Sequence, residues 1–126
     1  MSFAPVEATL KGSAGVTALL GTNPTRVWPQ GQSPAKGTTL YGEPYAVFQQ
    51  ITGQPENYLG TLPDSDDSTT QIDIYAASVS AARAVAIAIR NAVEPVAYVV
   101  ALREMGKDAT TNLSRISMDV DWITNR

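Results

Sequence analysis

The sequence predicts an α+β fold, in which a mostly antiparallel β-sheet carries a long amphipathic helix and N-terminal helices on one face. Residues 78–93 place apolar side chains at steps of three and four, which is typical of a helix lying on a core. Segments rich in β-branched and aromatic residues lie on both sides of this helix and predict strands. A length of 126 residues indicates one domain, spanning residues 1–126.

The first expected helical region covers residues 5–20. Pro5 suits a first helical turn, because an N–H group at that position would have no partner in the helix. We expect Gly12 and Ser13 to divide the region into two short helices, with the Ser13 hydroxyl capping the second. Gly21 is expected to end it, since glycine readily adopts the backbone conformation that follows a helix.

Three strands are expected before the long helix. A short one at residues 26–28 is stopped by Pro29, and a second at residues 45–52 is ended by the turn residues 53–55. Residues 69–76 alternate cleanly, which predicts a strand with one buried face and one wetter face. The expected buried face holds Thr70, Ile72, Ile74 and Ala76, and the wetter face holds Gln71, Asp73 and Tyr75.

The helix at residues 78–93 is expected to be capped by Ser78 or Ser80 and to end at Glu94, which precedes a proline. Its apolar stripe contains Val79, Ala82, Val85, Ala86, Ile89 and Val93.

A strand at residues 96–102, apolar on both faces, is expected next. A polar connection at residues 103–112, with a turn at 106–108, should lead to a last strand at residues 113–123. On that strand Ile116, Met118, Val120 and Trp122 point one way, and Arg115, Ser117, Asp119 and Asp121 point the other.

Two long polar segments, residues 30–44 and 56–68, interrupt this pattern. Both have few apolar side chains to offset the entropic cost of ordering them, so we expect residues 30–42 and 56–68 to be mobile in the isolated chain. Against a neighbouring subunit they should become ordered.

The composition excludes several functions. Without cysteine or histidine, the chain has no disulfides, zinc-thiolate sites, thiol nucleophiles or Ser-His-Asp chemistry. A net charge of −3 and a pI near 4.7 argue against a protein that binds nucleic acid through phosphate contacts. The N-terminus lacks a basic region followed by an apolar stretch, and no segment is long and apolar enough for a bilayer. We therefore expect a soluble, non-exported protein without a membrane partner.

No residue pattern indicates catalysis, a cofactor or a metal. Asp64, Asp66 and Asp67 resemble the start of a calcium loop, but the glycine and glutamate that such a loop needs are missing downstream. Asp119 and Asp121 share one strand face, which favours a polar sheet face or a subunit contact over a catalytic pair. The sequence thus predicts a protein that is not an enzyme.

Arg83 and Arg90 lie seven residues apart on one side of the long helix. They could form its solvent edge or pair with acidic residues of a neighbouring chain. With Asp119 and Asp121 they are the candidate residues of a subunit interface.

The order of segments resembles the small tail-completion, or tail-terminator, proteins of long-tailed bacteriophages. The resemblance covers essentially the whole chain and rests on short strings in a fixed order. These are VTALLG at residues 16–21, TRVWPQG at 25–31, PYAVFQQITGQP at 44–55, QIDIYA at 71–76, the alanine-rich helix at 81–93 and the closing strand at 114–122. The segment at residues 30–42 departs from the family's pattern.

The resemblance implies a structural virion protein at the head-proximal end of the tail, assembled in the bacterial host cytoplasm. Members of the group cap the tail tube, stop tail polymerisation and join the tail to the head. They work as a homo-oligomeric ring, commonly of six copies, in contact with the tail tube protein and a head-completion or connector protein. DNA passes through the ring without specific binding, which an acidic chain would favour.

Two alternatives stay open at this point. One is a head-side completion or connector protein, which would bind the portal vertex. The other is a small-molecule binding module, or an enzyme that uses Asp119 and Asp121.

Overall fold

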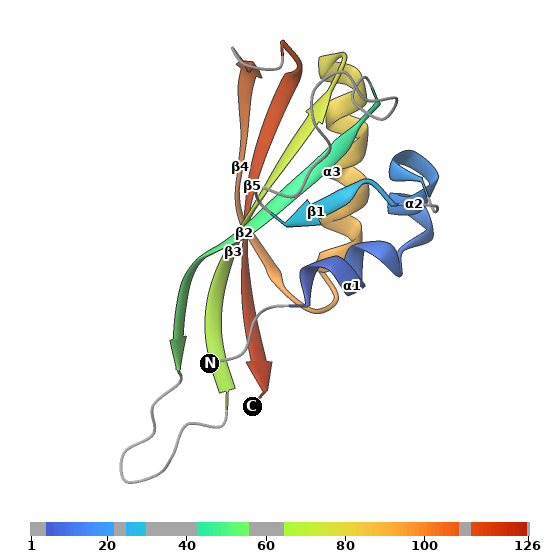
Figure 1. Ribbon diagram of the computed structural model, residues 1–126. Helices are drawn as coiled ribbons and strands as arrows, with labels where there is room; N and C mark the ends of the chain where they lie inside the picture. Colours follow the sequence, from blue (N-terminus) through green and yellow to red (C-terminus); the bar gives the residue numbers. More distant parts are fainter. Residues whose placement is uncertain (1–4, 22–24, 30–42, 56–64, 109–111, 126) are drawn as a thin grey trace, which may run out of the picture.

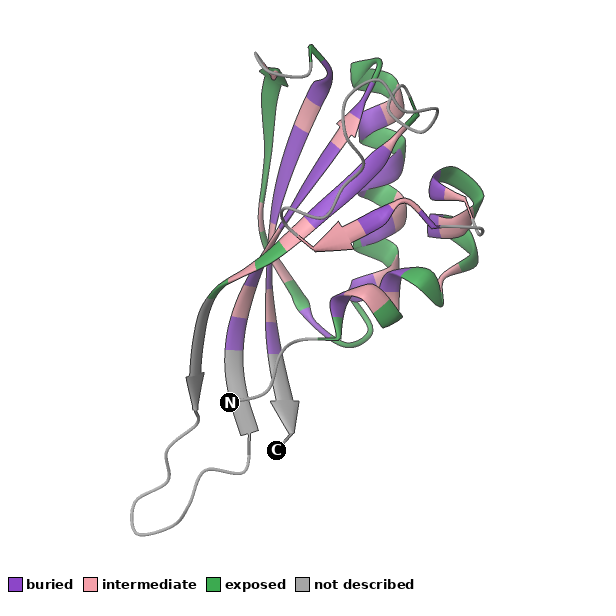
Figure 2. Ribbon diagram, in the orientation of Figure 1, coloured by how far each residue is buried: buried purple, intermediate pink, exposed green. Residues whose placement is uncertain are grey.

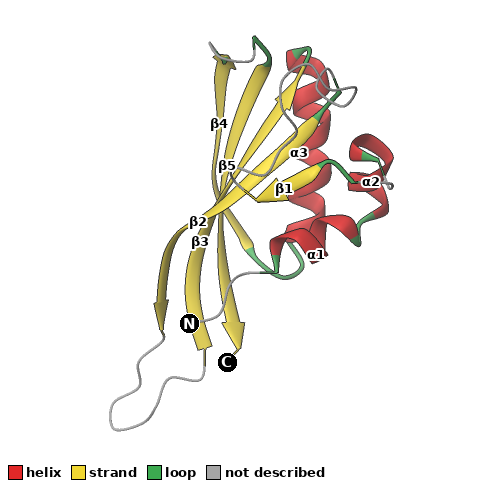
Figure 3. Ribbon diagram, in the orientation of Figure 1, coloured by secondary structure: helices red, strands yellow, loops and turns green. Residues whose placement is uncertain are grey.

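The computed structural model describes residues 5–21, 25–29, 43–55, 65–108 and 112–125. Within these ranges the chain forms two layers, a five-stranded sheet and three helices that cover one of its faces (Figures 1 and 3). The predicted α+β fold is therefore confirmed.

Two short helices begin the helix layer, as predicted. They are α1 (Val6–Lys11) and α2 (Ala14–Leu20). The Ser13 hydroxyl accepts a hydrogen bond from the Val16 N–H group at 3.4 Å, which caps α2. Gly21 follows with a φ of 84°, a backbone conformation that glycine adopts without strain. Because the chain breaks after α1, each short helix can bury its own pair of apolar side chains. These are Val6 and Leu10 in α1, and Val16 and Leu20 in α2.

The sheet has the strand order β1-β2-β3-β5-β4. β1 runs parallel to β2, and the other neighbouring strands are antiparallel. The longest ladder joins β3 and β5 over twelve residue pairs, from Ser65↔Asn125 to Ala76↔Ser114. The strands are β1 (Val27–Pro29), β2 (Tyr45–Pro55), β3 (Ser65–Ala76), β4 (Tyr98–Lys107) and β5 (Ser114–Asn125).

The long helix α3 (Val79–Val93) follows β3 and precedes β4 in the chain. It packs on the face of the sheet that the helices cover. The Ser78 hydroxyl caps it by accepting from the Ala81 N–H group at 3.1 Å. The predicted apolar stripe is buried, with one correction. Val79, in the first turn, is 44% exposed because it lies beyond the end of the core. The buried members are Ala82, Val85, Ala86, Ile89 and Val93.

The core lies between the three helices and the face of the sheet that they cover (Figure 2). The alternation predicted for β3 and β5 places their apolar residues in this core. The largest fully buried side chains are Trp122, Leu10, Leu20, Ile72, Ile74, Ile89, Ile116, Met118, Val16, Val27, Val85 and Val93.

Pro29, expected to stop the first strand, is the last residue of β1, and three other strand boundaries differ from the prediction by three residues or more. Residues 103–107, expected in a connection, continue β4, because all of them except Met105 find register partners on β5. The chain leaves the strand at Asp108, whose carbonyl accepts from the Asn112 N–H group at 2.7 Å. An edge strand tolerates this polar sequence, since its outer side needs no apolar neighbours.

The other two corrections concern the ladder between β2 and β3. β2 continues through Gly53 to Pro55, and β3 begins at Ser65, so Asp66 and Asp67 lie in a strand instead of a loop. Proline is compatible with a strand end on an outer edge. Asp64 and the segments 30–42 and 56–64 lie outside the described residues, so the mobility of the two polar segments stays a prediction.

Two isoleucines of α3 offer a test of this packing. Ile89→Ala should lower the free energy of unfolding by about 2–4 kcal/mol, because it empties a fully buried site. Ile87→Ala, on the same helix but 61% exposed, should change it by less than about 0.5 kcal/mol. Chemical denaturation of both variants measures the difference. Equal losses would contradict the orientation of α3.

Candidate interaction surfaces

The face of the sheet opposite the helices carries polar side chains that pair with one another. Asp73 of β3 is buried, and its carboxylate accepts from Arg115 at 3.0 Å and from the Gln71 side chain at 3.0 and 3.2 Å. β3 and β5 place Asp73 and Arg115 on neighbouring strands two residues out of register. A buried carboxylate needs such donors, because water no longer solvates it.

The two candidate aspartates of β5 lie on this open face and each has a partner within the chain. The Asp119 carboxylate accepts from both terminal nitrogens of Arg103 on β4, at 3.2 Å each. This hydrogen bond raises the pKa of Arg103 above its ordinary value. Asp121 accepts from the Thr69 hydroxyl at 2.6 Å. Both carboxylates are thus held by groups of neighbouring strands, Asp119 by an arginine and Asp121 by a hydroxyl.

One end of the open face carries stacked aromatic rings. Tyr45 and Tyr75 stack at 5.0 Å between centroids, and Trp28 tilts against Tyr45 at 6.0 Å. The Arg115 guanidinium lies 5.8 Å from the centre of the Tyr75 ring. Burial raises the pKa of the Tyr75 hydroxyl, although the charge of Arg115 acts in the opposite direction. This cluster covers the sheet end without help from a helix.

The two candidate arginines lie on the exposed side of α3, and each has an acidic partner within the chain. Arg83 pairs with Glu104 of β4, and Arg90 pairs with Glu94 at 2.6 Å. The hydrogen bond between Arg83 and Glu104 raises the pKa of the arginine and lowers that of the glutamate. Both arginine side chains remain about 60% exposed. The structure thus places Arg83 and Arg90 on the helix side of the sheet edge, and Asp119 and Asp121 on its other side.

A second surface, the α3–β4 flank, is apolar and was not predicted. Nine large apolar side chains of the described residues are exposed, and seven of them lie on α3, on β4 or between the two. They make up the flank: Val79, Ile87, Val96, Tyr98, Val100, Leu102 and Met105. Such a gathering on one edge is typical of an interaction surface. One feature of the sequence indicates this surface: the strand expected at residues 96–102 is apolar on both faces, although it forms an edge strand of the sheet.

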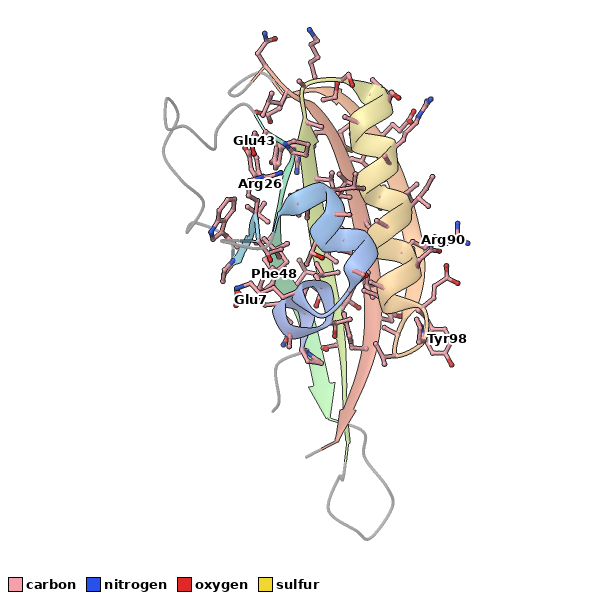
Figure 4. The ribbon with its side chains drawn as sticks, turned by 90° about the vertical axis from the view of Figure 1, so that its right-hand side faces the viewer. Glu7, Arg26, Glu43, Phe48, Arg90 and Tyr98 are labelled. Atoms are coloured by element: carbon pink, nitrogen blue, oxygen red, sulfur yellow. The ribbon has the colours of Figure 1, made fainter. Side chains whose placement is uncertain are left out.

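The flank contains a shallow hollow between α3 and β4. Its volume is about 230 Å³, and Ile87 and Leu102 lie on opposite walls with Arg83 and Arg90 along the helix side. Figure 4 shows Arg90 and Tyr98 on this side of the molecule and Glu43 on the opposite side. The hollow is thus apolar in the middle, and its charged border holds Arg83 and Arg90 together with Glu104, the partner of Arg83.

Among the described residues, no group of three acidic side chains is placed to hold a metal ion. No helix in the described part of the chain is long and apolar enough to cross a membrane. The described residues thus form a two-layer fold with paired charges on one face and exposed apolar side chains along one edge.

Similarity to known proteins identifies the class of this protein more closely. The family described as "Tail completion protein gp17" matches residues 4–125, so the chain belongs to that family of structural tail proteins. No curated protein sequence matches the chain. A chain in a structure described as the virion of a native gene transfer agent particle has the same fold, with a TM-score of 0.72 and 14% sequence identity. The superposition covers 96% of this chain and 92% of that one.

The buried ion pair of the open face can be tested against an exposed one. Arg115→Met should lower the free energy of unfolding by about 2 kcal/mol, because it leaves the buried Asp73 carboxylate without its charged donor. Arg90→Met removes a pair that is about half exposed on both sides and should leave stability unchanged. Thermal and urea unfolding measure both. A silent Arg115→Met variant would refute the role given to the pair.

Proposed function

We propose that this protein caps the head-proximal end of the phage tail tube, stops tail polymerisation and joins the tail to the head. The match to the tail completion family over residues 4–125 carries this proposal. The fold shared with a chain of a gene transfer agent virion supports it, because that chain comes from an assembled particle. An absence of catalytic groupings among the described residues is compatible with a role that is structural.

The active form in this proposal is a closed homo-oligomeric ring, a hexamer, around the channel through which DNA passes. A ring requires a heterologous interface, in which one patch of a subunit meets a different patch of the next. The chain presents chemically different surfaces on its two sides, which suits such an arrangement. Its partners are the tail tube protein and a head-completion or connector protein, and it needs no cofactor.

The net charge of −3 fits a channel that DNA crosses without specific binding, since an acidic lining repels phosphate. In this scheme the protein is assembled in the host cytoplasm and stays in the virion.

Electron microscopy tests the proposal directly. The purified protein, alone and mixed with tail tubes, should form six-fold rings that bind one end of each tube and prevent further growth. Antibody labelling of finished particles should mark the joint between tail and head. Labelling of the portal side in heads that lack tails would instead favour a head-side connector. A single copy at the joint, or an open filament of subunits, would refute the ring.

Within the ring we propose that Arg83 and Arg90 of one subunit face Asp119 and Asp121 of the next. Each of the four has an intrachain partner, and exposed pairs of this kind contribute little energy. Opposite charges on two separate elements would instead set the register between neighbours.

Charge reversal distinguishes this contact from a merely solvated helix edge. The double variant Arg83→Glu/Arg90→Glu should need about a tenfold higher concentration to form rings, because attraction becomes repulsion at every contact. Lys11→Glu reverses a charge on α1 at a side chain that is 45% exposed and also paired at i,i+4; it is the control and should assemble normally. Sedimentation measures assembly, and circular dichroism checks the fold. Normal assembly of the double variant would refute these residues as the interface while leaving the ring intact.

A further inference from the structure

Three exposed apolar residues occupy β-bulges, where one strand inserts an extra residue. The register of β4 against β5 skips Val100 and Met105, and the register of β2 against β3 skips Ile51. These residues are 55%, 49% and 44% exposed. A bulge interrupts the regular alternation of side chains between the two faces of a sheet. The side chains of these three residues therefore do not follow that alternation.

The bulges of β4 and the bulge of β2 lie toward opposite edges of the sheet. β4 is one edge strand, and β2 lies next to the short β1 at the other end of the strand order. β1 pairs with β2 only from Ala46 to Phe48, so among the described residues no strand covers the outer side of β2 at Ile51. Figure 4 labels Phe48 of β2 and Arg90 of α3 on opposite sides of the molecule.

Charge is also divided unevenly along the chain. Residues 79–107, which form α3 and β4, contain four Arg or Lys and two Glu, a net charge of +2. The remaining residues contain five Lys or Arg and ten Asp or Glu, a net charge of −5. The α3–β4 part of the chain is thus net positive and the rest of the same chain net negative, so a second copy offers the opposite net charge, although Arg83 and Arg90 each already pair with a glutamate.

We propose that the α3–β4 flank of one subunit packs on the β2 bulge at Ile51 of a second copy, head to tail. This assignment rests on the proposed ring and names the surfaces that close it. Both sides contribute apolar side chains that the isolated subunit leaves in water, so their burial supplies the energy that exposed ion pairs do not.

The register places Ile51 at the same level of the sheet as Asp121. Thr52 pairs with Thr69, and Thr69 pairs with Asp121. β3 lies between β2 and Asp121, so a neighbour seated at Ile51 would meet the sheet at the level of Asp121 but two strands away from it. The bulges at Val100 and Met105 interrupt a regular outer ladder on β4, so the contact is made by side chains and does not extend the sheet.

A cysteine-free chain makes this contact accessible to cross-linking without background. Three single variants, Leu102→Cys, Ile51→Cys and Leu19→Cys, replace residues that are 49%, 44% and 38% exposed. They are mixed in pairs, assembled on tail tubes and treated with a short bifunctional maleimide. Leu19, on α2, is the control for an exposed apolar site outside the proposed contact.

The Leu102→Cys and Ile51→Cys variants should cross-link to each other at least about tenfold more than either does to itself or to Leu19→Cys. The double variant Leu102→Cys/Ile51→Cys should give a covalent ladder that ends at the size of the ring. Rings seen by electron microscopy without this cross-link would overturn the interface but not the ring. Dimers of Leu102→Cys with itself would show a symmetric contact and overturn the head-to-tail assignment. If neither rings nor cross-links form, both proposals fail.

Discussion

The register between β3 and β5 is the constraint on which the rest of this structure depends. Twelve antiparallel pairs align Ile72 with Met118 and Ile74 with Ile116 on the face that the helices cover. The same register sets Asp73 and Arg115 within reach of each other on the opposite face. A slip of one residue in this pairing would move the apolar side chains of one strand to the open face and bury its charged side chains against α3. The hydrophobic core and the polar ladder thus specify one alignment from two sides.

Because the helices cover only one face, the polar groups of the other face must be hydrated or must pair with one another. They form pairs drawn from three adjacent strands: Asp73 with Arg115, Asp119 with Arg103, and Asp121 with Thr69. These pairs satisfy the carboxylates of the open face, Asp73 and Asp119 with arginines and Asp121 with a hydroxyl, and the aromatic end of the face is stacked. The contact proposed for Asp119 and Asp121 with a neighbouring subunit would be made on this polar face.

The α3–β4 flank is different, because no element in the described part of the subunit covers its apolar side chains. A natural edge strand is usually short, charged or bulged to prevent unwanted pairing. β4 is long, is apolar from Tyr98 to Leu102 and carries two bulges, which block simple sheet extension but keep the apolar side chains outside. This combination is what a subunit needs if it must join copies of itself in one geometry and avoid open-ended aggregation. Membership of the tail completion family gives a setting in which a closed assembly of this kind is useful.

The sequence by itself determined the fold class, the two N-terminal helices, the faces of β3 and β5 and the buried stripe of α3. These depend on local periodicity and capping residues such as Ser13 and Ser78, which act over a few residues. Only the tertiary structure decided that residues 103–107 and 53–55 are strands, because partners on distant strands supplied their hydrogen bonds. It also decided the intrachain partners of Arg83, Arg90, Asp119 and Asp121. The bulges at Ile51, Val100 and Met105 were beyond sequence reasoning, since a bulge is a mismatch between two strands and neither strand carries it alone.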